Sequence, residues 1–139
     1  MKKYLNISLF YGIAAMVGGV FYREFTKWNG YQEVTALGKV HTHLFMMGMF
    51  MFLIVALFAA QQDLQKQKTF RIFMPVYNAG LAVTVIMMIV RGITEVLHIS
   101  LSSAANASIS GIAGIGHMLT GAGILLFLIS LKKTVEKRD

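Results

Sequence analysis

Apolar residues along the chain fall into four long blocks separated by short polar connections. The blocks are Tyr4–Tyr22, Val40–Ala60, Ile72–Ile99 and Ile109–Leu131. Each is close to the roughly 20 residues that an α-helix needs to cross the hydrocarbon layer of a bilayer. None shows the strict apolar and polar alternation of a membrane β-strand. The pattern predicts an all-α, four-helix transmembrane bundle in which residues 1–139 form one integral membrane domain.

The connections contain the residues expected to end helices. Asn29 and Gly30 form a turn signal after the first block, and the last two blocks are linked by a stretch built mainly of serine, alanine and asparagine. A third helix that begins near Ile72 has Pro75 in its first turn, where the missing amide proton costs little.

Composition and charge placement agree with a membrane protein. Hydrophobic residues make up 56% of the chain and charged residues 14%, which is too apolar for a soluble domain. The net charge of +7 is unevenly placed. One side of the serpentine has Lys2, Lys3, Lys66, Lys68, Arg71, Lys132, Lys133, Lys137 and Arg138, and the other has Arg23, Lys27 and Lys39. The positive-inside rule therefore predicts that both termini are cytoplasmic, and nucleic acid is not an expected partner.

All four histidines lie in the predicted outer half of the bundle: His41 and His43 in the second helix, His98 at the end of the third, and His117 in the fourth. Ionisable groups at membrane depth are costly and usually face the bundle interior with a partner or a function. The chain has no cysteine, which excludes thiolate metal sites and haem attached through a CxxCH motif.

In the fourth helix, Gly114, His117 and Gly121 are spaced i, i+3, i+7 and so share one face. Glycines at this spacing let transmembrane helices approach closely, which is the ordinary interpretation. The alternative is that they leave room for a flat cofactor whose iron the imidazole binds.

In the second helix, His41 and His43 are turned from each other by about 200° and cannot face the same neighbour. His41 shares its face with Gly48, which repeats the glycine pattern around His117. His43 is deeper and nearer the expected level of His117. Both histidines therefore stay candidate ligands.

The third helix contains Arg91, Glu95 and His98 at i, i+4, i+7, a polar stripe in an apolar segment. One interpretation is an ion pair that fixes helix register. The other gives Arg91 an anionic partner such as a haem propionate, with Glu95 and His98 on a proton or quinol path. Arg23, at the outer end of the first helix, is a candidate member of the same group.

Haem is the metal group that best matches these histidines. Two imidazoles from facing helices can hold a porphyrin inside a helix bundle. Closed zinc sites usually need four ligands, whereas these histidines come from three helices and one pair diverges.

The run from Val40 to Gly48, which contains His41-Thr42-His43-Leu44, resembles the His-x-His-Leu-x-x-x-Gly stretch in haem-bearing helices of small relatives of haem-copper oxidase catalytic subunits. Over nearly its whole length the chain also resembles a family of small four-helix bacterial membrane proteins, some associated with haem handling. This resemblance implies non-covalent haem b, a bacterial plasma membrane, and a role in haem sensing or tolerance. The oxidases' other helices and histidines are missing, so a complete oxygen-reducing centre is not expected.

The leading hypothesis is a b-type haem protein ligated by His117 and by His41 or His43, serving quinol-linked electron transfer or haem sensing. The alternatives are a small transporter that uses the stripe of Arg91 and Glu95, and a structural partner subunit. The lipid bilayer is the expected environment, a quinol is the expected electron donor, and the glycine-lined faces favour self-association.

Overall fold

The structure, a computed structural model, describes residues 1–136 and contains four helices long and apolar enough to cross a membrane. Three of them are continuous: α1 (Lys2–Trp28), α4 (Lys68–Val96) and α5 (Ser103–Val135). The other is a rod of three segments: α2 (Leu37–His43), the π-helix η1 (Leu44–Phe50) and α3 (Met51–Gln61). A short 3₁₀ helix, η2 (Leu64–Lys66), precedes α4.

This architecture confirms the prediction of an all-α protein with four apolar helices, and the described residues contain no strand. The side of the membrane on which the termini lie stays a prediction. Lys137 and Arg138, two of the charges on which it rests, lie outside the described residues.

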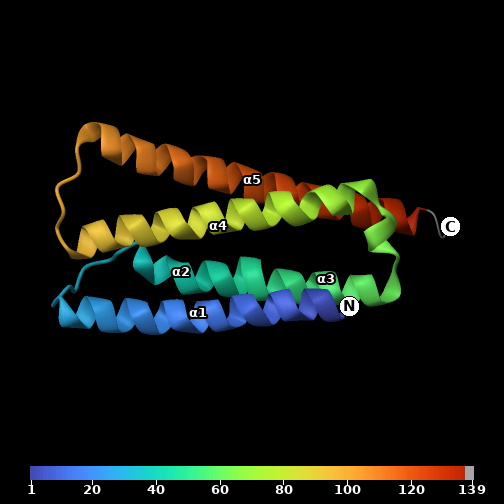
Figure 1. The fold of residues 1–139 in the computed structure, drawn as a ribbon, viewed down its shortest axis with the longest axis horizontal. Helices are drawn as coiled ribbons and strands as arrows, with labels where there is room; N and C mark the ends of the chain where they lie inside the picture. Colours follow the sequence, from blue (N-terminus) through green and yellow to red (C-terminus); the bar gives the residue numbers. More distant parts are fainter. Residues whose placement is uncertain (137–139) are drawn as a thin grey trace.

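The helices lie side by side in the order α1, then the α2–α3 rod, then α4, then α5 (Figure 1). Both termini and the connection through η2 lie at one end, called here the terminal end. The connections between α1 and α2 and between α4 and α5 lie at the other, the loop end. Close packing joins α1 to the rod, α2 to α4, and α4 to α5.

The helices differ from the predicted ones at their ends. The third helix begins at Lys68 rather than Ile72, because the polar residues before the apolar block are already helical. Pro75 therefore lies beyond the first turn of the helix and not within it. The same helix ends at Val96 rather than Ile99. His98 has a φ of 51°, a left-handed conformation that cannot continue a right-handed helix, so it lies in the connection.

Glycines set the distance between α4 and α5. A Cβ atom built on Gly80 would lie 2.5 Å from the Thr120 backbone nitrogen, and one on Gly116 would lie 2.6 Å from Thr84 Oγ1. A Cβ on Gly123 would lie 2.8 Å from Cβ of Tyr77. Transmembrane helices gain most of their association energy from such close contact, because lipid provides no hydrophobic force between them.

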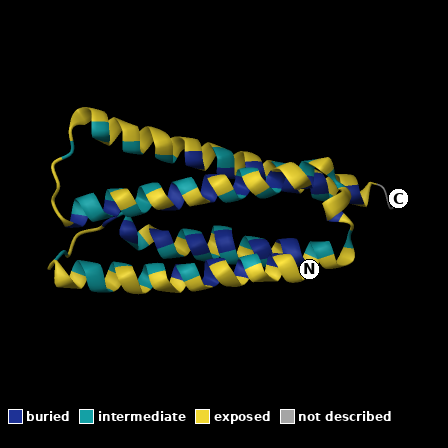
Figure 2. Ribbon diagram, viewed as in Figure 1, coloured by how far each residue is buried: buried dark blue, intermediate teal, exposed yellow. Residues whose placement is uncertain are grey.

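The largest buried side chains are aromatic and gather towards the terminal end. Phe52, Phe70, Phe73, Tyr77 and Phe127 are at most 3% exposed and form a chain of ring contacts. The loop-end half of α5 differs, since its first buried residue is Gly116 (Figure 2). There α5 diverges from α4 (Figure 1).

Because the helices form a row, a gap lies between each pair of helices that are separated by one other helix. One gap lies between α1 and α4, and residues of α2 and η1, Val40 and Leu44, contribute to its wall. The other lies between the α2–α3 rod and α5. Phe58 and Phe127 bridge this second gap near the terminal end, with ring centroids 6.4 Å apart.

We predict that Gly116→Ala lowers the stability of the bundle by about 1–3 kcal/mol, because the added methyl group overpacks against Thr84. Thermal unfolding of the purified protein in detergent measures the effect. The matched control is Gly111→Ala in the same helix, where the added Cβ meets nothing within 4 Å. Equal melting temperatures for the two variants would contradict the packing role.

Candidate functional site

His43 and His117 face each other across the gap between the α2–α3 rod and α5. Their ring centroids are 6.3 Å apart and the ring planes are inclined at 86°. Bonds of about 2 Å from imidazole nitrogen to a metal place the centroids of two opposed imidazoles roughly 6 Å apart. The separation of the pair therefore suits two ligands on opposite sides of one ion.

Both rings are oriented by the same backbone contact. The Nδ1 atom of His43 lies 2.9 Å from the Lys39 carbonyl oxygen, and that of His117 lies 2.9 Å from the Ala113 carbonyl oxygen. A carbonyl oxygen can only accept, so Nδ1 carries the proton in each ring and the neutral imidazole has its lone pair on Nε2. A backbone carbonyl that fixes the tautomer in this way is one of the usual second partners of a metal-bound histidine.

The π-helix η1 begins directly after His43 and is bonded by both neighbouring helices. Ser8 of α1 donates to the Met49 carbonyl oxygen at 2.8 Å, and Tyr77 of α4 donates to the Met47 carbonyl oxygen at 2.6 Å. Such irregular segments in helices are often found beside functional residues. Here the two hydroxyl groups fix the helical segment that follows His43.

The glycines beside His117 have open space around them. A Cβ atom built on Gly114 or on Gly121 meets nothing within 4 Å, whereas Gly116 and Gly123 lie against α4. Helix packing therefore explains Gly116 and Gly123 and does not explain Gly114 and Gly121. The face that carries His117 is free of neighbouring side chains at these two positions.

His41 and Gly48 lie on the opposite side of the rod, against α1. A Cβ built on Gly19 would lie 3.6 Å from Cβ of His41, and one on Gly48 would lie 2.6 Å from Cγ of Tyr11. The Nδ1 atom of His41 is buried without a hydrogen-bond partner. Of the two candidate histidines in this helix, His43 is the one opposite His117.

Arg91 bonds to α5. Its guanidinium donates to Asn106 Oδ1 at 2.6 Å and to Ser110 Oγ at 2.7 Å. It also lines a cavity of about 210 Å³ at the loop end together with Ala36, Met87, Met88, Ile109, Ser110 and Ala113. Ala113 accepts the hydrogen bond of His117, so this cavity lies one helical turn from the histidine along α5.

Glu95 bonds to the start of α2 rather than to Arg91. Its Oε2 atom accepts from the Ala36 backbone nitrogen at 2.8 Å and from Thr35 Oγ1 at 2.9 Å. This carboxylate satisfies an amide that a helix start leaves unpaired, as a capping side chain does, and its negative charge suits that position. The ion pair that the stripe offered as one interpretation is not formed.

His98 and Arg23 lie away from the facing histidines. His98 contacts Tyr31, with ring centroids 5.6 Å apart. Partial burial, and then the carboxylates of Glu33 and Glu95, raise the pKa of Tyr31. The side chain of Arg23 is 80% exposed and pairs with Glu24 at 3.8 Å. Within residues 1–136 no three His, Cys, Asp or Glu side chains gather as a zinc site would require.

Several residues of the site were missed by the sequence reasoning. Ser8, Tyr77, Thr35, Asn106 and Ser110 each bond a residue or segment beside the histidines. The available signal was that Ser8 and Tyr77 are polar groups in apolar segments, where an unpaired hydroxyl is costly.

The four apolar helices fit a multi-pass membrane protein, and a pair of histidines faces each other near the loop end. Residues 1–134 match the family model described as protein of unknown function (DUF2871), and the chain belongs to that family. No curated protein and no solved structure matches it.

We predict that Glu95→Ala destabilises the start of α2 by about 1–2 kcal/mol, the usual cost of losing a helix cap. Amide hydrogen exchange at residues 36–40 should become faster, while exchange in α5 stays unchanged. Glu95→Gln retains a side-chain acceptor and should give a smaller effect. Unchanged exchange in Glu95→Ala would show that the carboxylate does not cap the helix.

Proposed function

We propose that this chain is a haem-binding protein of the bacterial plasma membrane, with both termini cytoplasmic, in which His43 and His117 ligate a b-type haem. The observation that carries the proposal is the facing pair itself, 6.3 Å between ring centroids with both Nδ1 atoms bonded to backbone carbonyls. In each ring this leaves Nε2 as the available ligand atom. The likeness of the Val40–Gly48 run to haem-bearing helices points the same way.

The open space beside His117 supports a bound haem rather than a bare metal ion. Gly114 and Gly121 flank His117 and have no atoms near their missing Cβ positions. The loop-end half of α5 has no buried residue before Gly116, so the surface next to the histidines is open to a large apolar ligand. A porphyrin needs only two axial ligands from the protein.

Arg91 is the cation available to the haem carboxylates. Its guanidinium donates to neutral partners, Asn106 and Ser110. The ion pairs among residues 1–136 involve other cations, namely Arg23, Lys66 and Lys132. An uncompensated guanidinium at membrane depth is costly, and a propionate would pair with it.

Two protein ligands determine the chemistry. His43 and His117 would both hold the haem iron, and a haem held by two histidines would supply one-electron transfer rather than substrate binding at iron. A membrane quinol is the electron donor we propose. His43 and His117 would hold the iron and Arg91 would neutralise the carboxylates, while Glu95 and Ser8 position the helix that carries His43.

We expect protein purified from haem-replete cells to have a sharp Soret band and a reduced α-band. His43→Ala and His117→Ala should each lose most of the bound haem, because each removes one axial ligand. His41→Ala and His98→Ala are the matched controls and should retain the spectrum. A colourless wild type that stays unchanged with added hemin would falsify the proposal.

The glycine argument gives a second test. Gly114→Leu should reduce haem content several-fold, because the side chain would fill the space beside His117. Gly111→Leu is the control, since its Cβ also meets open space but is farther round the helix from His117. Equal haem content in the two variants would argue against a porphyrin at this face.

We also predict that carbon monoxide leaves the reduced spectrum of the wild type unchanged, because no axial position is open. Haem reduction by a short-chain quinol should proceed in the wild type. A carbon monoxide shift in the wild type would instead favour gas or haem sensing over electron transfer.

A further inference from the structure

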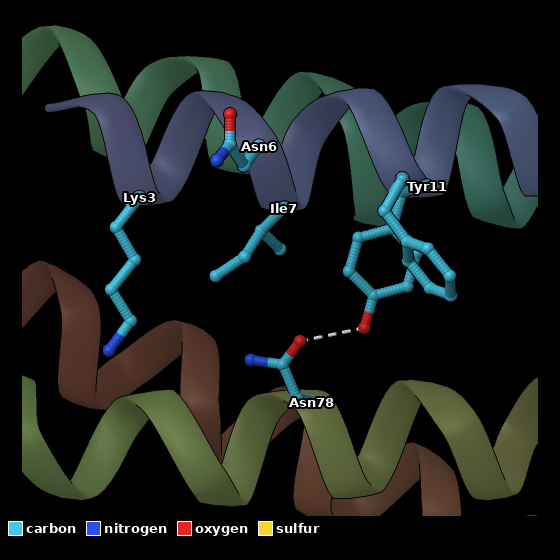
Figure 3. Close-up of a pocket in the computed structure, with 6 residues that line it drawn as sticks. Lys3, Asn6, Ile7, Tyr11 and Asn78 are labelled. Atoms are coloured by element: carbon cyan, nitrogen blue, oxygen red, sulfur yellow. Dashed lines mark hydrogen bonds between the residues drawn. The ribbon is translucent and has the colours of Figure 1, made fainter.

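A groove runs along the gap between α1 and α4. Its first part, about 500 Å³ near the terminal end, is lined by Lys3, Asn6, Ile7, Phe10, Tyr11 and Asn78 (Figure 3). A second part of about 490 Å³ shares Phe10 and Tyr11 and continues towards Phe21 and Ile89. The two cavities adjoin at Phe10 and Tyr11, where the Tyr11 hydroxyl bonds to Asn78 of α4, and together they form the groove.

The polar groups of this groove are concentrated at its terminal end. Lys3 extends into the space between α1 and α4 (Figure 3), and it forms no ion pair within residues 1–136. Deeper in the groove, Tyr11 donates to Asn78 at 2.7 Å, and Asn78 donates to the Met74 carbonyl oxygen at 2.7 Å. The deeper polar groups thus bond to protein, and the cation at the mouth does not.

The distance from Lys3 into the apolar part matches one leaflet. From Lys3 to Val17 the rise of about 1.5 Å per residue gives roughly 21 Å. Half of a bilayer, headgroups included, is about 20–22 Å thick. Beyond Tyr11 the walls are apolar side chains or glycine, with Ala14, Val17 and Gly18 on α1 and Ala82, Val85 and Ile86 on α4.

We propose that this groove binds one anionic phospholipid, with its phosphate at Lys3 and one acyl chain between α1 and α4. A cation at the mouth and an apolar channel beyond it match the two ends of such a lipid. A quinone head group would need free hydrogen-bonding partners at depth, and Tyr11 and Asn78 bind each other. The lipid would fill the gap that the row of helices leaves beside α1.

The test is native mass spectrometry of delipidated protein titrated with phosphatidylglycerol or phosphatidylcholine of identical acyl chains. Wild type should prefer the anionic lipid by about fivefold, the value expected for one lysine near a membrane surface. Lys3→Gln should lose this preference. The matched control is Lys2→Gln, one residue away and outside the groove lining, which should retain it.

A second pair of variants tests the channel. Ala82→Phe, on the α4 wall, should weaken binding of both lipids, while Ala122→Phe on the exposed face of α5 should not. Circular dichroism and a single elution peak establish that each variant is folded. Equal affinity of wild type for the two lipids overturns the proposal, as do equal losses in Lys3→Gln and Lys2→Gln. A quinone that copurifies with wild type and is absent from Ala82→Phe would also overturn it.

Discussion

The close approach of α4 to its neighbours at glycine positions is the contact on which the rest of the structure depends. At Gly80 a Cβ would lie 2.5 Å from the Thr120 nitrogen of α5, and at Gly92 one would lie 2.5 Å from the Leu37 nitrogen of α2. In lipid, apolar side chains gain little by leaving the solvent for one another, so the van der Waals contact of closely packed backbones decides which helices associate. Through these glycines α4 binds α2 on one side and α5 on the other.

Polar side chains of α4 then fix the positions of the two histidines. Glu95 bonds the residues that begin α2, before His43, and Tyr77 bonds a carbonyl of η1, after it. His117 directly follows Gly116, the first buried residue of α5. Each histidine is therefore carried by a segment that α4 holds at close range. The 6.3 Å separation of the rings is a consequence of these contacts rather than of any bond between the histidines.

The helices themselves could be predicted from the sequence, because the apolar blocks are long and the connections are short and polar. Residue-level roles could not. Periodicity shows that His41 and His43 diverge, but it does not say which neighbour each faces. Gly114 and Gly116 are two residues apart in the same helix, and the sequence does not distinguish them. A Cβ atom on Gly114 would meet open space, whereas one on Gly116 would meet Thr84. The spacing of Arg91 and Glu95 in one helix is typical of an ion pair, but it contains no information about partners on other helices. In the structure, Glu95 bonds to the start of α2 and Arg91 bonds to α5.

A row of four helices has no enclosed interior, and this decides how a large ligand can be held. The gap between the rod and α5 is closed by Phe58 and Phe127 near the terminal end, where rings touch across it. Near the loop end the same gap contains His43 and His117, and the adjoining half of α5 has no buried residue. Burial alone would retain a cofactor weakly at such an open position. Retention would then come from bonds, two to the metal and charge pairing at Arg91, so removal of either imidazole should release the group rather than merely loosen it.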